Sequence, residues 1–394
     1  MTAKDLLLAA RTLFPDSEVS LGRVDRRQTN ALRLVPPGER AKLAIPAGAP
    51  LAAARTISRP SAGDSIARAL FRESLAAAER TRVLGCVTRA AITIDHIDGS
   101  IVQHLSEVFR RRVVVGLMVG SARANRKPVL NVFAEDGSEL GFAKVGLGEL
   151  ANKLVSAEAQ ALGQLGGLDL RQMQIPRVIS AEPWRGSSTV VLSPLRSPRL
   201  QRGMALPVAA LDELAASAGI PRALALGASA WGQRLSAQLD HGVADTPLPS
   251  LISRTLERYG AVEWSFGPWH GDFGPWNMLR TSSIPMVWDW ERFDTQMPVG
   301  LDALHFTIHR ELASKVGDAL PIDHLLSAAA HVLAAQRIDS PDKRSTMVPP
   351  LLAAYLLTYA ARFVGEGLAH GVPRTTSLGL RYAGHLERLL EADV

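Results

Sequence analysis

Hydrophobic and polar residues alternate in two short segments near the start of the chain, which predicts two β-strands. The segments are Ala31–Val35 and Lys42–Ile45, and Pro36-Pro37-Gly38 between them favours a turn. Residues 65–81 follow the helical period instead and predict a helix. Because segments rich in proline and glycine surround these elements, we interpret residues 1–105 as an accessory region, to which the sequence assigns no function.

A second set of short apolar segments begins after residue 105 and predicts a small antiparallel sheet. Asp136-Gly137 separates two of them and is typical of a hairpin turn, because these residues tolerate positive φ. Glu149–Leu165 has the period of a helix. This predicted sheet lobe spans residues 106–196, and its strands are Val113–Val119, Val129–Ala134, Leu140–Val145, Ile175–Ile179 and Thr189–Leu192.

After residue 196 most apolar residues recur at helical spacing, so residues 197–394 are interpreted as a helical lobe. The whole chain is therefore predicted to have an α+β fold, in which a small antiparallel sheet lobe precedes a larger helical lobe, with a ligand cleft between them. The predicted helices are Val208–Ala218, Arg222–Asp240, Ser250–Val262 and most of residues 300–394. They are interrupted by an irregular segment, Ser265–Asn277, and by two brief strands, Met278–Arg280 and Met286–Trp290.

The composition is that of a globular protein and bears on its partners and its compartment. The 394 residues are 47% hydrophobic and 21% charged, as in ordinary globular domains, and the formal net charge is +6. A basic run such as Arg110-Arg111-Arg112 is interpreted as a solvated face, so no nucleic-acid partner is expected. The chain has one cysteine, Cys86, which we interpret as a core residue. A reducing, cytoplasmic compartment is therefore expected.

Two apolar segments bear on targeting. Met1–Phe14 is interrupted by Asp5 and Arg11 and is not followed by a cleavage-site pattern, so no signal peptide is expected. Leu351–Phe363 is the most apolar helical stretch, but it is shorter than the ~20 residues that a membrane span needs. We interpret it as a buried helix and expect no membrane span.

The candidate chemistry lies in His270–Asn277 and the strand that follows. Two glycines and a proline prevent a helix in this segment, so its polar side chains can converge on one point. Asn277 and Asp289 supply oxygen atoms, which suit a hard cation such as Mg²⁺ that takes few protein ligands. Asp272 is then the carboxylate that can orient a hydroxyl and accept its proton.

The pattern His-Gly-Asp-x-x-x-x-Asn, followed by an apolar strand ending in Asp-Trp-Glu, resembles the aminoglycoside phosphotransferase and choline kinase group. These small-molecule kinases are similar to protein kinases in fold, and the resemblance covers both predicted lobes. It implies a bilobal, protein-kinase-like fold, with Asp272 as the catalytic base and Asn277 and Asp289 as metal ligands. It also implies structural roles for His270, which would brace the loop, and for Asp302, which would cap the next helix.

A kinase also needs a cation on the nucleotide phosphates and an acid that holds this cation. Lys144 lies in the third strand of the sheet lobe, between apolar residues. Glu158 lies beside the apolar stripe of the following helix, where a lone carboxylate would be costly. We therefore predict a Lys144–Glu158 pair, and Lys153, which is on the helix itself, fits this role less well.

Two further segments are candidates for contacts with the nucleotide, which is ATP or GTP. The loop of residues 120–128 has one glycine in place of Gly-x-Gly-x-x-Gly, and Ser121 with the neighbouring backbone amides is expected to meet a phosphate. The hinge is expected at Ser193 and Leu195, where backbone groups would bind the purine. Pro194 between them removes one donor.

Aromatic and histidine residues around the loop allow two interpretations each. The tryptophans form either a stacking wall for a sugar or part of the core; they are Trp264, Trp269, Trp276, Trp288 and Trp290. His305 and His309 have the i, i+4 spacing of a zinc site on a helix. No third ligand stands nearby in the sequence, so we interpret the pair as a partly buried helix face.

Together these features predict Mg²⁺-dependent transfer of the γ-phosphate of ATP or GTP to a hydroxyl of a sugar, amino sugar or amino alcohol. The alternative is a nucleotide-binding pseudokinase that acts as a scaffold through residues 1–105, and the intact site residues argue against it. A polycationic antibiotic would need an acidic pocket in the helical lobe. Acidic residues are present there (Glu291, Asp294, Glu311 and Glu366), but Arg310, Arg362 and Arg381 offset them. A metabolic or cell-envelope sugar is therefore favoured, and the oligomeric state is left open.

Overall fold

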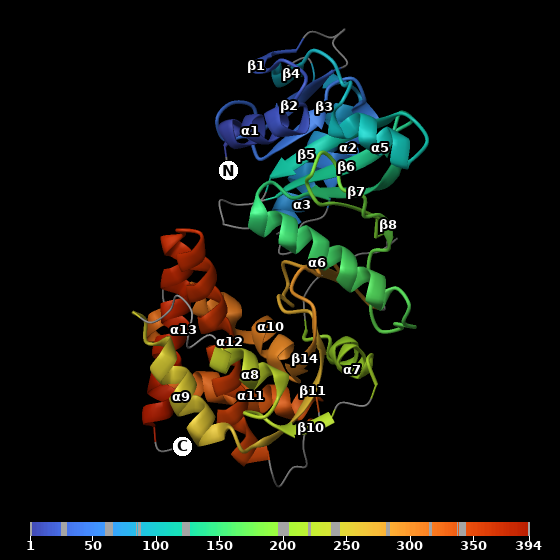
Figure 1. Cartoon of the computed structure of the whole chain (residues 1–394). Helices are drawn as coiled ribbons and strands as arrows, with labels where there is room; N and C mark the ends of the chain where they lie inside the picture. Colours follow the sequence, from blue (N-terminus) through green and yellow to red (C-terminus); the bar gives the residue numbers. More distant parts are fainter. Residues whose placement is uncertain are drawn as a thin grey trace. The chain divides into compact units, whose positions relative to one another are not determined.

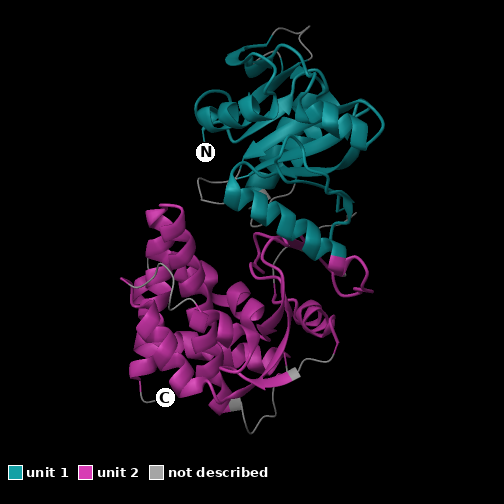
Figure 2. Cartoon of the chain, in the orientation of Figure 1, with its two compact units in different colours: residues 1–163, 175–196 teal, residues 164–174, 197–394 magenta. Residues whose placement is uncertain are grey.

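The computed structural model describes residues 2–24, 30–59, 66–83, 85, 88–119, 127–195, 205–219, 222–237, 245–280, 284–314, 317–336, 338 and 344–392. The chain divides into two compact units (Figure 2). Unit 1 comprises residues 1–163 and 175–196, and unit 2 comprises residues 164–174 and 197–394. Cys86 lies outside the described residues.

Unit 1 is built on a nine-stranded sheet with the strand order β1-β4-β2-β3-β5-β6-β7-β9-β8 (Figure 1). All of its described strand pairs are antiparallel. The strands are β1 (Val19–Arg23), β2 (Ala31–Val35), β3 (Leu43–Pro46), β4 (Ala90–Ile94), β5 (Val113–Val119), β6 (Pro128–Ala134), β7 (Glu139–Val145), β8 (Val178–Ser180) and β9 (Thr189–Leu192).

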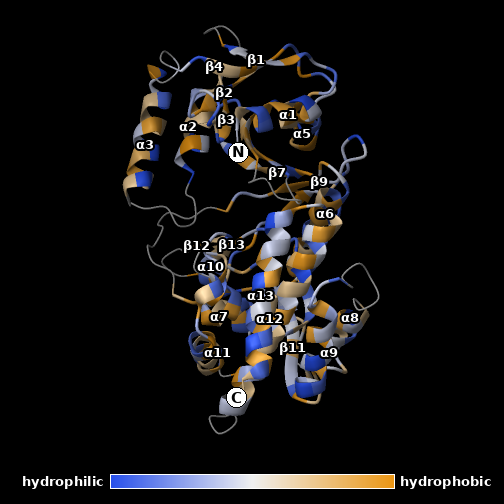
Figure 3. Cartoon of the chain, turned by 90° about the vertical axis from the view of Figure 1, so that its left-hand side faces the viewer, coloured by the Kyte–Doolittle hydropathy of each residue, from blue (hydrophilic) through white to orange (hydrophobic). Residues whose placement is uncertain are grey.

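Helices cover this sheet, and one apolar core runs from the first helix through its central strands. Leu6 and Leu13 of the first helix pack in the same buried cluster as Val115 and Val132 of the sheet. The described helices of unit 1 are α1 (Ala3–Leu13), α2 (Pro50–Ser58), α3 (Ile66–Arg80), α5 (Ile101–Val108) and α6 (Glu149–Leu165). The visible side of α3 carries hydrophobic as well as hydrophilic residues (Figure 3), and Leu70 and Phe71 on it are exposed.

The compact units differ from the predicted division at residue 105. β3 pairs with β5, with Leu43 opposite Met118 and Ala44 opposite Leu117. The backbone groups on that edge of β5 are thus paired by a strand from the predicted accessory region, which lies in the same sheet and the same core as residues 106–196. The last residue of unit 1 is Arg196, whereas residues 164–174 of the predicted sheet lobe belong to unit 2, so the predicted division into domains stays a prediction.

Unit 2 is mainly helical and also contains a three-stranded sheet and a two-stranded hairpin. The sheet has the order β10-β11-β14, and its strands are β10 (Arg222–Ala225), β11 (Glu263–Trp269) and β14 (Asp294–Pro298). The hairpin pairs β12 (Met278–Arg280) with β13 (Pro285–Val287). The helices are α7 (Val208–Ala216), α8 (Ala230–Ala237), α9 (Leu248–Tyr259), α10 (Leu301–Leu312), α11 (Ile322–Gln336), α12 (Arg344–Ala369) and α13 (Pro373–Glu391), with a 3₁₀ turn at Gly317–Ala319. The predicted α+β fold, an antiparallel sheet unit followed by a mostly helical unit, is confirmed.

Helix α12 is the longest element of the described chain and supports the loop that carries the candidate chemistry. It extends beyond the predicted buried stretch at both ends, and by length and composition Ser345–Ala369 could cross a membrane. Within this structure, however, 83% of its most apolar 18-residue window is buried. Helix α13 packs closely on α12 at Gly379. A Cβ added at this glycine would lie 2.6 Å from the backbone nitrogen of Val364 on α12. The expectation that the chain has no membrane span stays a prediction.

Candidate active site

The loop of residues 270–277 follows directly after β11, and the first turn of α10 holds its start. The backbone N–H groups of His270 and Gly271 donate to the two carboxylate oxygens of Asp302, over 2.6 and 3.0 Å. Asp302 itself is buried. A structural role was predicted for this residue, but its carboxylate binds the loop, whereas the N-cap position of α10 is Gly300.

The fully buried imidazole of His270 connects two parts of the site. Its Nδ1 accepts a hydrogen bond from the Asp272 backbone N–H over 3.2 Å, so the ring proton lies on Nε2. Nε2 in turn donates to the Trp288 carbonyl over 3.0 Å. His270 therefore fixes the loop against the residue that precedes Asp289, which is the bracing that the sequence predicted.

Three donors surround the carboxylate of Asp272. Oδ1 accepts from Trp276 Nε1 over 3.2 Å and from His305 Nε2 over 3.1 Å, and Oδ2 accepts from Asn277 Nδ2 over 2.8 Å. Burial raises the pKa of Asp272, but the hydrogen bond with His305 opposes this effect, and the pKa lies below its usual value. The side chain keeps 35% exposure, so the group is an ionised acceptor that remains within reach of a ligand.

The hairpin β12–β13 brings Asn277 and Asp289 to the same end of its ladder. Met278 pairs with Val287, and the Trp288 N–H donates to the Asn277 carbonyl over 3.1 Å. The side-chain nitrogen of Asn277 donates to both the carbonyl and the carboxylate of Asp272, which leaves its amide oxygen Oδ1 as the atom that suits a cation.

Asp289 has a φ of +71°, in the left-handed region that residues other than glycine rarely adopt. Such a conformation costs about 1–3 kcal/mol and persists where the surrounding structure fixes it, often at a functional site. A carboxylate and an amide oxygen at one end of a hairpin are hard ligands of the kind that Mg²⁺ prefers. The residues present therefore fit this cation.

Helix α12 holds the loop from the other side through the carbonyl of Gly271. That oxygen accepts from the Tyr359 hydroxyl over 3.0 Å and from Arg362 Nη1 over 2.6 Å. Gly271 has a φ of +83°, and a Cβ there would lie 2.5 Å from the Arg292 carbonyl oxygen. Neither a left-handed backbone nor this contact suits any other residue.

We expect Gly271→Ala to destabilise unit 2 and to distort the loop. The left-handed conformation alone costs an alanine about 1 kcal/mol, and the contact with Arg292 adds to it. Gly371→Ala is the matched control, because Gly371 has a φ of +61° but nothing within 4 Å of an added Cβ. Denaturant titration of both variants measures the difference. Equal losses of unfolding free energy would show that the contact at residue 271 is unimportant.

In unit 1, the predicted Lys144–Glu158 pair is confirmed. Lys144 of β7 contacts both carboxylate oxygens of Glu158 on α6, each over 2.6 Å. The two side chains are 9% and 0% exposed. Lys153, by contrast, forms an exposed pair with Glu149 on the same helix. The binding of a nucleotide by Lys144 stays a prediction.

The other predicted nucleotide contacts also stay predictions. Ser193 uses its N–H to donate to the Arg177 carbonyl over 2.8 Å, and its hydroxyl accepts from the Arg177 N–H over 2.9 Å. The backbone N–H of Ser193 is therefore used within unit 1, and its carbonyl oxygen and its hydroxyl proton are the groups that it can offer a purine. Leu195 is described and half-buried, whereas Ser121 lies outside the described residues.

Two side chains that contact Asp272 were not predicted as site residues. His305 was interpreted as part of a helix face, and it is fully buried with its Nε2 on the Asp272 carboxylate. Trp276 is half-buried and donates to the same oxygen, whereas Trp264, Trp269 and Trp290 belong to the buried core. In the described part of the chain, neither His305 nor His309 belongs to a group of three metal-ligating side chains.

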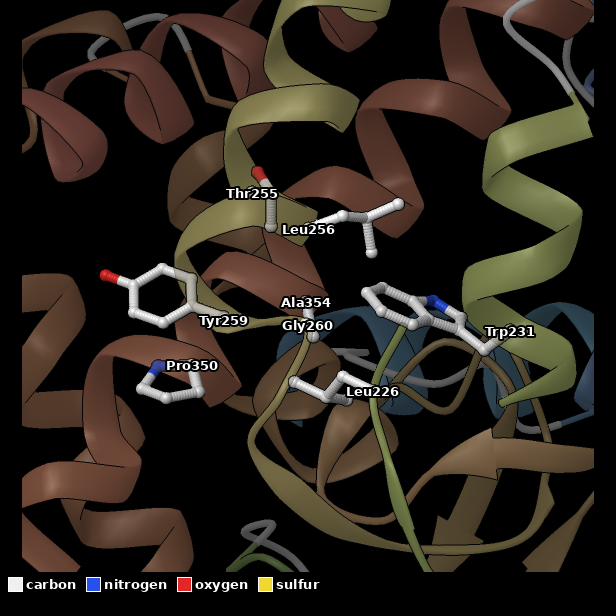
Figure 4. A pocket seen from close by; sticks show the side chains of 8 residues that line it. All are labelled: Leu226, Trp231, Thr255, Leu256, Tyr259, Gly260, Pro350 and Ala354. Atoms are coloured by element: carbon white, nitrogen blue, oxygen red, sulfur yellow. The ribbon is translucent and has the colours of Figure 1, made fainter. Parts of the chain in front are cut away.

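A small pocket elsewhere in unit 2 lies between α8, α9 and α12 (Figure 4). Apolar side chains such as Leu226 and Trp231 dominate its lining. Tyr259 stands at its edge with the hydroxyl directed away from the other labelled side chains. Because this pocket offers few polar groups, it is not the candidate active site.

No family model matches the chain, and no curated protein matches it in sequence. Solved structures do resemble it. A thermostable mutant of aminoglycoside phosphotransferase APH(4)-Ia is 12% identical, with a TM-score of 0.49 over 73% of this chain and 99% of that chain. A putative fructosamine-3-kinase from Haemophilus somnus 129PT is 14% identical, with a TM-score of 0.40 over 72% and 96%. A choline/ethanolamine kinase family protein from Mesorhizobium loti is 14% identical, with a TM-score of 0.44 over 70% and 88%. At these values the similarity concerns the path of the backbone and not the substrate.

Proposed function

We propose that the protein is a small-molecule kinase that transfers the γ-phosphate of ATP or GTP, in a Mg²⁺-dependent reaction, to a hydroxyl of its substrate. The observation that carries this proposal is the arrangement around Asp272. An ionised, partly exposed carboxylate is hydrogen-bonded to Asn277, and Asp289 follows at the same end of one hairpin. Phosphoryl transfer needs positioned oxygen ligands and a carboxylate for the acceptor, and little covalent chemistry.

Each residue would then have one task. Asp272 would accept a hydrogen bond from the acceptor hydroxyl, orient it and take its proton. Asn277 Oδ1 and the Asp289 carboxylate would hold Mg²⁺, which when bound neutralises charge on the phosphate oxygens. Lys144, fixed by Glu158, would bind the α- and β-phosphates.

We favour a sugar, amino sugar or amino alcohol as acceptor over a polycationic antibiotic. Three of the four acidic residues considered for a cationic substrate form ion pairs within unit 2. Asp294 pairs with Arg234, Glu311 with His324, and Glu366 with Arg292. Carboxylates that already have cationic partners attract a polycation less strongly.

Release of nucleoside diphosphate tests the proposal. The protein is incubated with ATP or GTP and Mg²⁺, together with sugars, amino sugars, amino alcohols and aminoglycosides, and the same reactions are repeated with EDTA. We expect one acceptor class to stimulate release and EDTA to abolish it. If calorimetry detects nucleotide binding but no acceptor stimulates turnover, the protein is a pseudokinase scaffold instead.

Asp289→Asn should raise the Mg²⁺ concentration needed for half-maximal turnover. Asparagine tolerates the left-handed backbone at this position, so the change removes the charge and keeps the shape. Even residues that only support a metal ligand affect metal affinity about 10–100-fold, so we expect at least a 10-fold rise. Magnesium titrations of both proteins measure it, and an unchanged requirement would remove Asp289 from the metal site.

A further inference from the structure

We propose that His305, held in a single tautomer by the Tyr355 hydroxyl, is a positioning residue that fixes the Asp272 carboxylate for its acceptor. This inference rests on the proposed function, because it assigns Asp272 a hydroxyl to orient. It adds a residue that the sequence motif does not contain. The geometry behind it is a continuous chain of hydrogen bonds inside unit 2.

The series of hydrogen bonds begins at Asp272 and continues through the side chains of two histidines and two tyrosines. Asp272 Oδ1 lies 3.1 Å from His305 Nε2, and His305 Nδ1 lies 3.3 Å from the Tyr355 hydroxyl. That hydroxyl lies 3.3 Å from the Tyr382 hydroxyl, which lies 2.7 Å from His309 Nδ1. His305, Tyr355 and Tyr382 are fully buried, so water does not compete for these bonds.

The donor of every bond in this chain follows from the first bond. An ionised carboxylate only accepts, so His305 Nε2 carries the proton and donates to Asp272. Burial lowers the pKa of His305, which keeps its ring neutral, so Nδ1 accepts from the Tyr355 hydroxyl. Burial also raises the pKa of Tyr355 well above its usual value, which keeps this hydroxyl protonated.

The remaining two bonds are then determined as well. The single hydroxyl proton of Tyr355 is used on His305, so its oxygen accepts from Tyr382. The proton of Tyr382 is used in turn, so its oxygen accepts from the N–H at Nδ1 of His309. Every donor therefore points toward Asp272, and bonds aligned in this way strengthen one another. His305 and His309, one helical turn apart on α10, must carry the Nε2–H and the Nδ1–H form respectively.

Packing prevents the His305 ring from turning away. It stacks on Tyr359 with ring centroids 4.2 Å apart and an interplanar angle of 8°. Trp276 meets it edge-on at 5.5 Å. Trp276 thus contacts the ring and donates to the same carboxylate oxygen, Oδ1.

The consequence is a difference between the two oxygens of Asp272. Oδ1 takes two donors, from His305 and Trp276, whereas Oδ2 takes one, from Asn277. Oδ2 therefore retains accepting capacity for the substrate hydroxyl, and the bonds at Oδ1 fix the torsion of the carboxylate. Reactions of this kind are sensitive to placement, because a shift of about 1 Å in a reacting group costs on the order of 100-fold in rate.

Nitrogen NMR of the full chain with ¹⁵N-labelled histidine tests the tautomers without any substrate. We expect a neutral Nε2–H signature for His305 and an Nδ1–H signature for His309, assigned by the single variants His305→Gln and His309→Gln. In Tyr355→Phe, His305 loses the donor at Nδ1, and its Nε2–H population should fall. An imidazolium or an Nδ1–H form of His305 in the wild-type protein at neutral pH would overturn the proposal.

Turnover tests the catalytic consequence, with the acceptor found in the screen and Mg²⁺-ATP. We expect Tyr355→Phe and His305→Leu to lower kcat roughly 10- to 100-fold and to leave the KM for ATP within about 2-fold. His305→Gln should recover most of kcat, because its side-chain N–H reaches the position of Nε2. Tyr259→Phe is the matched control, since that hydroxyl is buried in the same unit without a hydrogen-bond partner among the described residues.

The outcomes separate the two proposals. Absence of turnover in the wild-type protein, together with the expected tautomers, would mean that the proposed function is wrong and that the chain of bonds is structural. Normal kcat in Tyr355→Phe and His305→Leu would overturn the positioning role while the kinase assignment stands. A loss in His305→Gln as large as that in His305→Leu, with unchanged thermal midpoints, would also count against it, because a retained donor should restore the carboxylate.

Discussion

Asp272→Ala is expected to lower kcat by about 10²–10⁴-fold, the range for loss of a general base, while nucleotide affinity changes only a few-fold. The carboxylate contacts Asn277, His305 and Trp276, and it is the only carboxylate of the described loop, residues 270–277. The nucleotide phosphates are assigned to other residues. Steady-state kinetics with the identified acceptor, combined with nucleotide-binding calorimetry, separates the two effects.

Asp318→Ala is the matched control for this variant. It removes a carboxylate of the same unit that is 71% exposed and pairs with Arg381, far from the loop in sequence. Exposed pairs of this type contribute little, so its kcat should equal that of the wild-type protein. If Asp272→Ala retained turnover within a few-fold of the wild-type value, another base would have to be found. If it lost nucleotide affinity to the same extent as kcat, Asp272 would serve ground-state binding.

The residues of the loop could be predicted because the motif is local. Asp272 and Asn277 lie five residues apart, and Asp289 follows within one hairpin, so a short stretch of sequence contains the whole arrangement. The Lys144–Glu158 pair was also predictable, since a charged residue beside an apolar helical stripe needs a partner and the preceding strand contains one.

The contact between His305 and Asp272 could not be predicted from local sequence patterns. Its spacing from His309 is visible in the sequence, but its three hydrogen-bonding and stacking partners come from distant segments. Asp272 is 33 residues before it, and Tyr355 is 50 residues after it. Tyr359 stacks on it from the same distant helix. The fold brings these segments together, so only the structure distinguishes a site residue from an ordinary buried histidine.

Two predicted elements of unit 2 were wrong for a related reason. Arg222–Asp240 was predicted as one helix, but Arg222–Ala225 forms β10 and the helix α8 covers only Ala230–Ala237. Ser265–Asn277 was predicted as irregular, with Gly271, Gly274 and Pro275 preventing a helix there, yet its first part belongs to β11. Each strand exists because it pairs with the other, and such pairing outweighs intrinsic propensity.

The sheet of unit 1 shows the same limit at a larger scale. Ala31–Val35, Val113–Val119 and Thr189–Leu192 were predicted at the bounds that the structure has. Which strand lies beside which was not predictable, because β3 and β5 are separated by a segment in which the structure describes three helices and a strand. Period-2 patterns identify a strand and its buried face, whereas the choice of neighbour depends on the whole core.

Removal of one partner of the buried pair in unit 1 should be strongly destabilising. Glu158→Ala leaves the Lys144 ammonium in a buried position without the carboxylate that contacts it over 2.6 Å. Losses of this kind cost about 3–5 kcal/mol of unfolding free energy. Lys153→Ala is the control, because its pair with Glu149 is exposed and should contribute no more than about 0.5 kcal/mol. Denaturant titrations of the variants and the wild-type protein give the comparison.

The double variant Lys144→Met/Glu158→Leu separates stability from function. Replacing both charges by apolar side chains of similar size removes the desolvation cost together with the attraction, so stability should return to within about 1–2 kcal/mol of the wild-type value. Turnover should stay lost, because no ammonium remains for the nucleotide phosphates. A double variant that recovers both stability and turnover would show that the pair only supports the fold. The double variant could instead be as unstable as Glu158→Ala. Because an apolar pair of similar volume restores the packing but not the hydrogen bonds, that result would show that the structure around β7 and α6 depends on the hydrogen bonds of the pair.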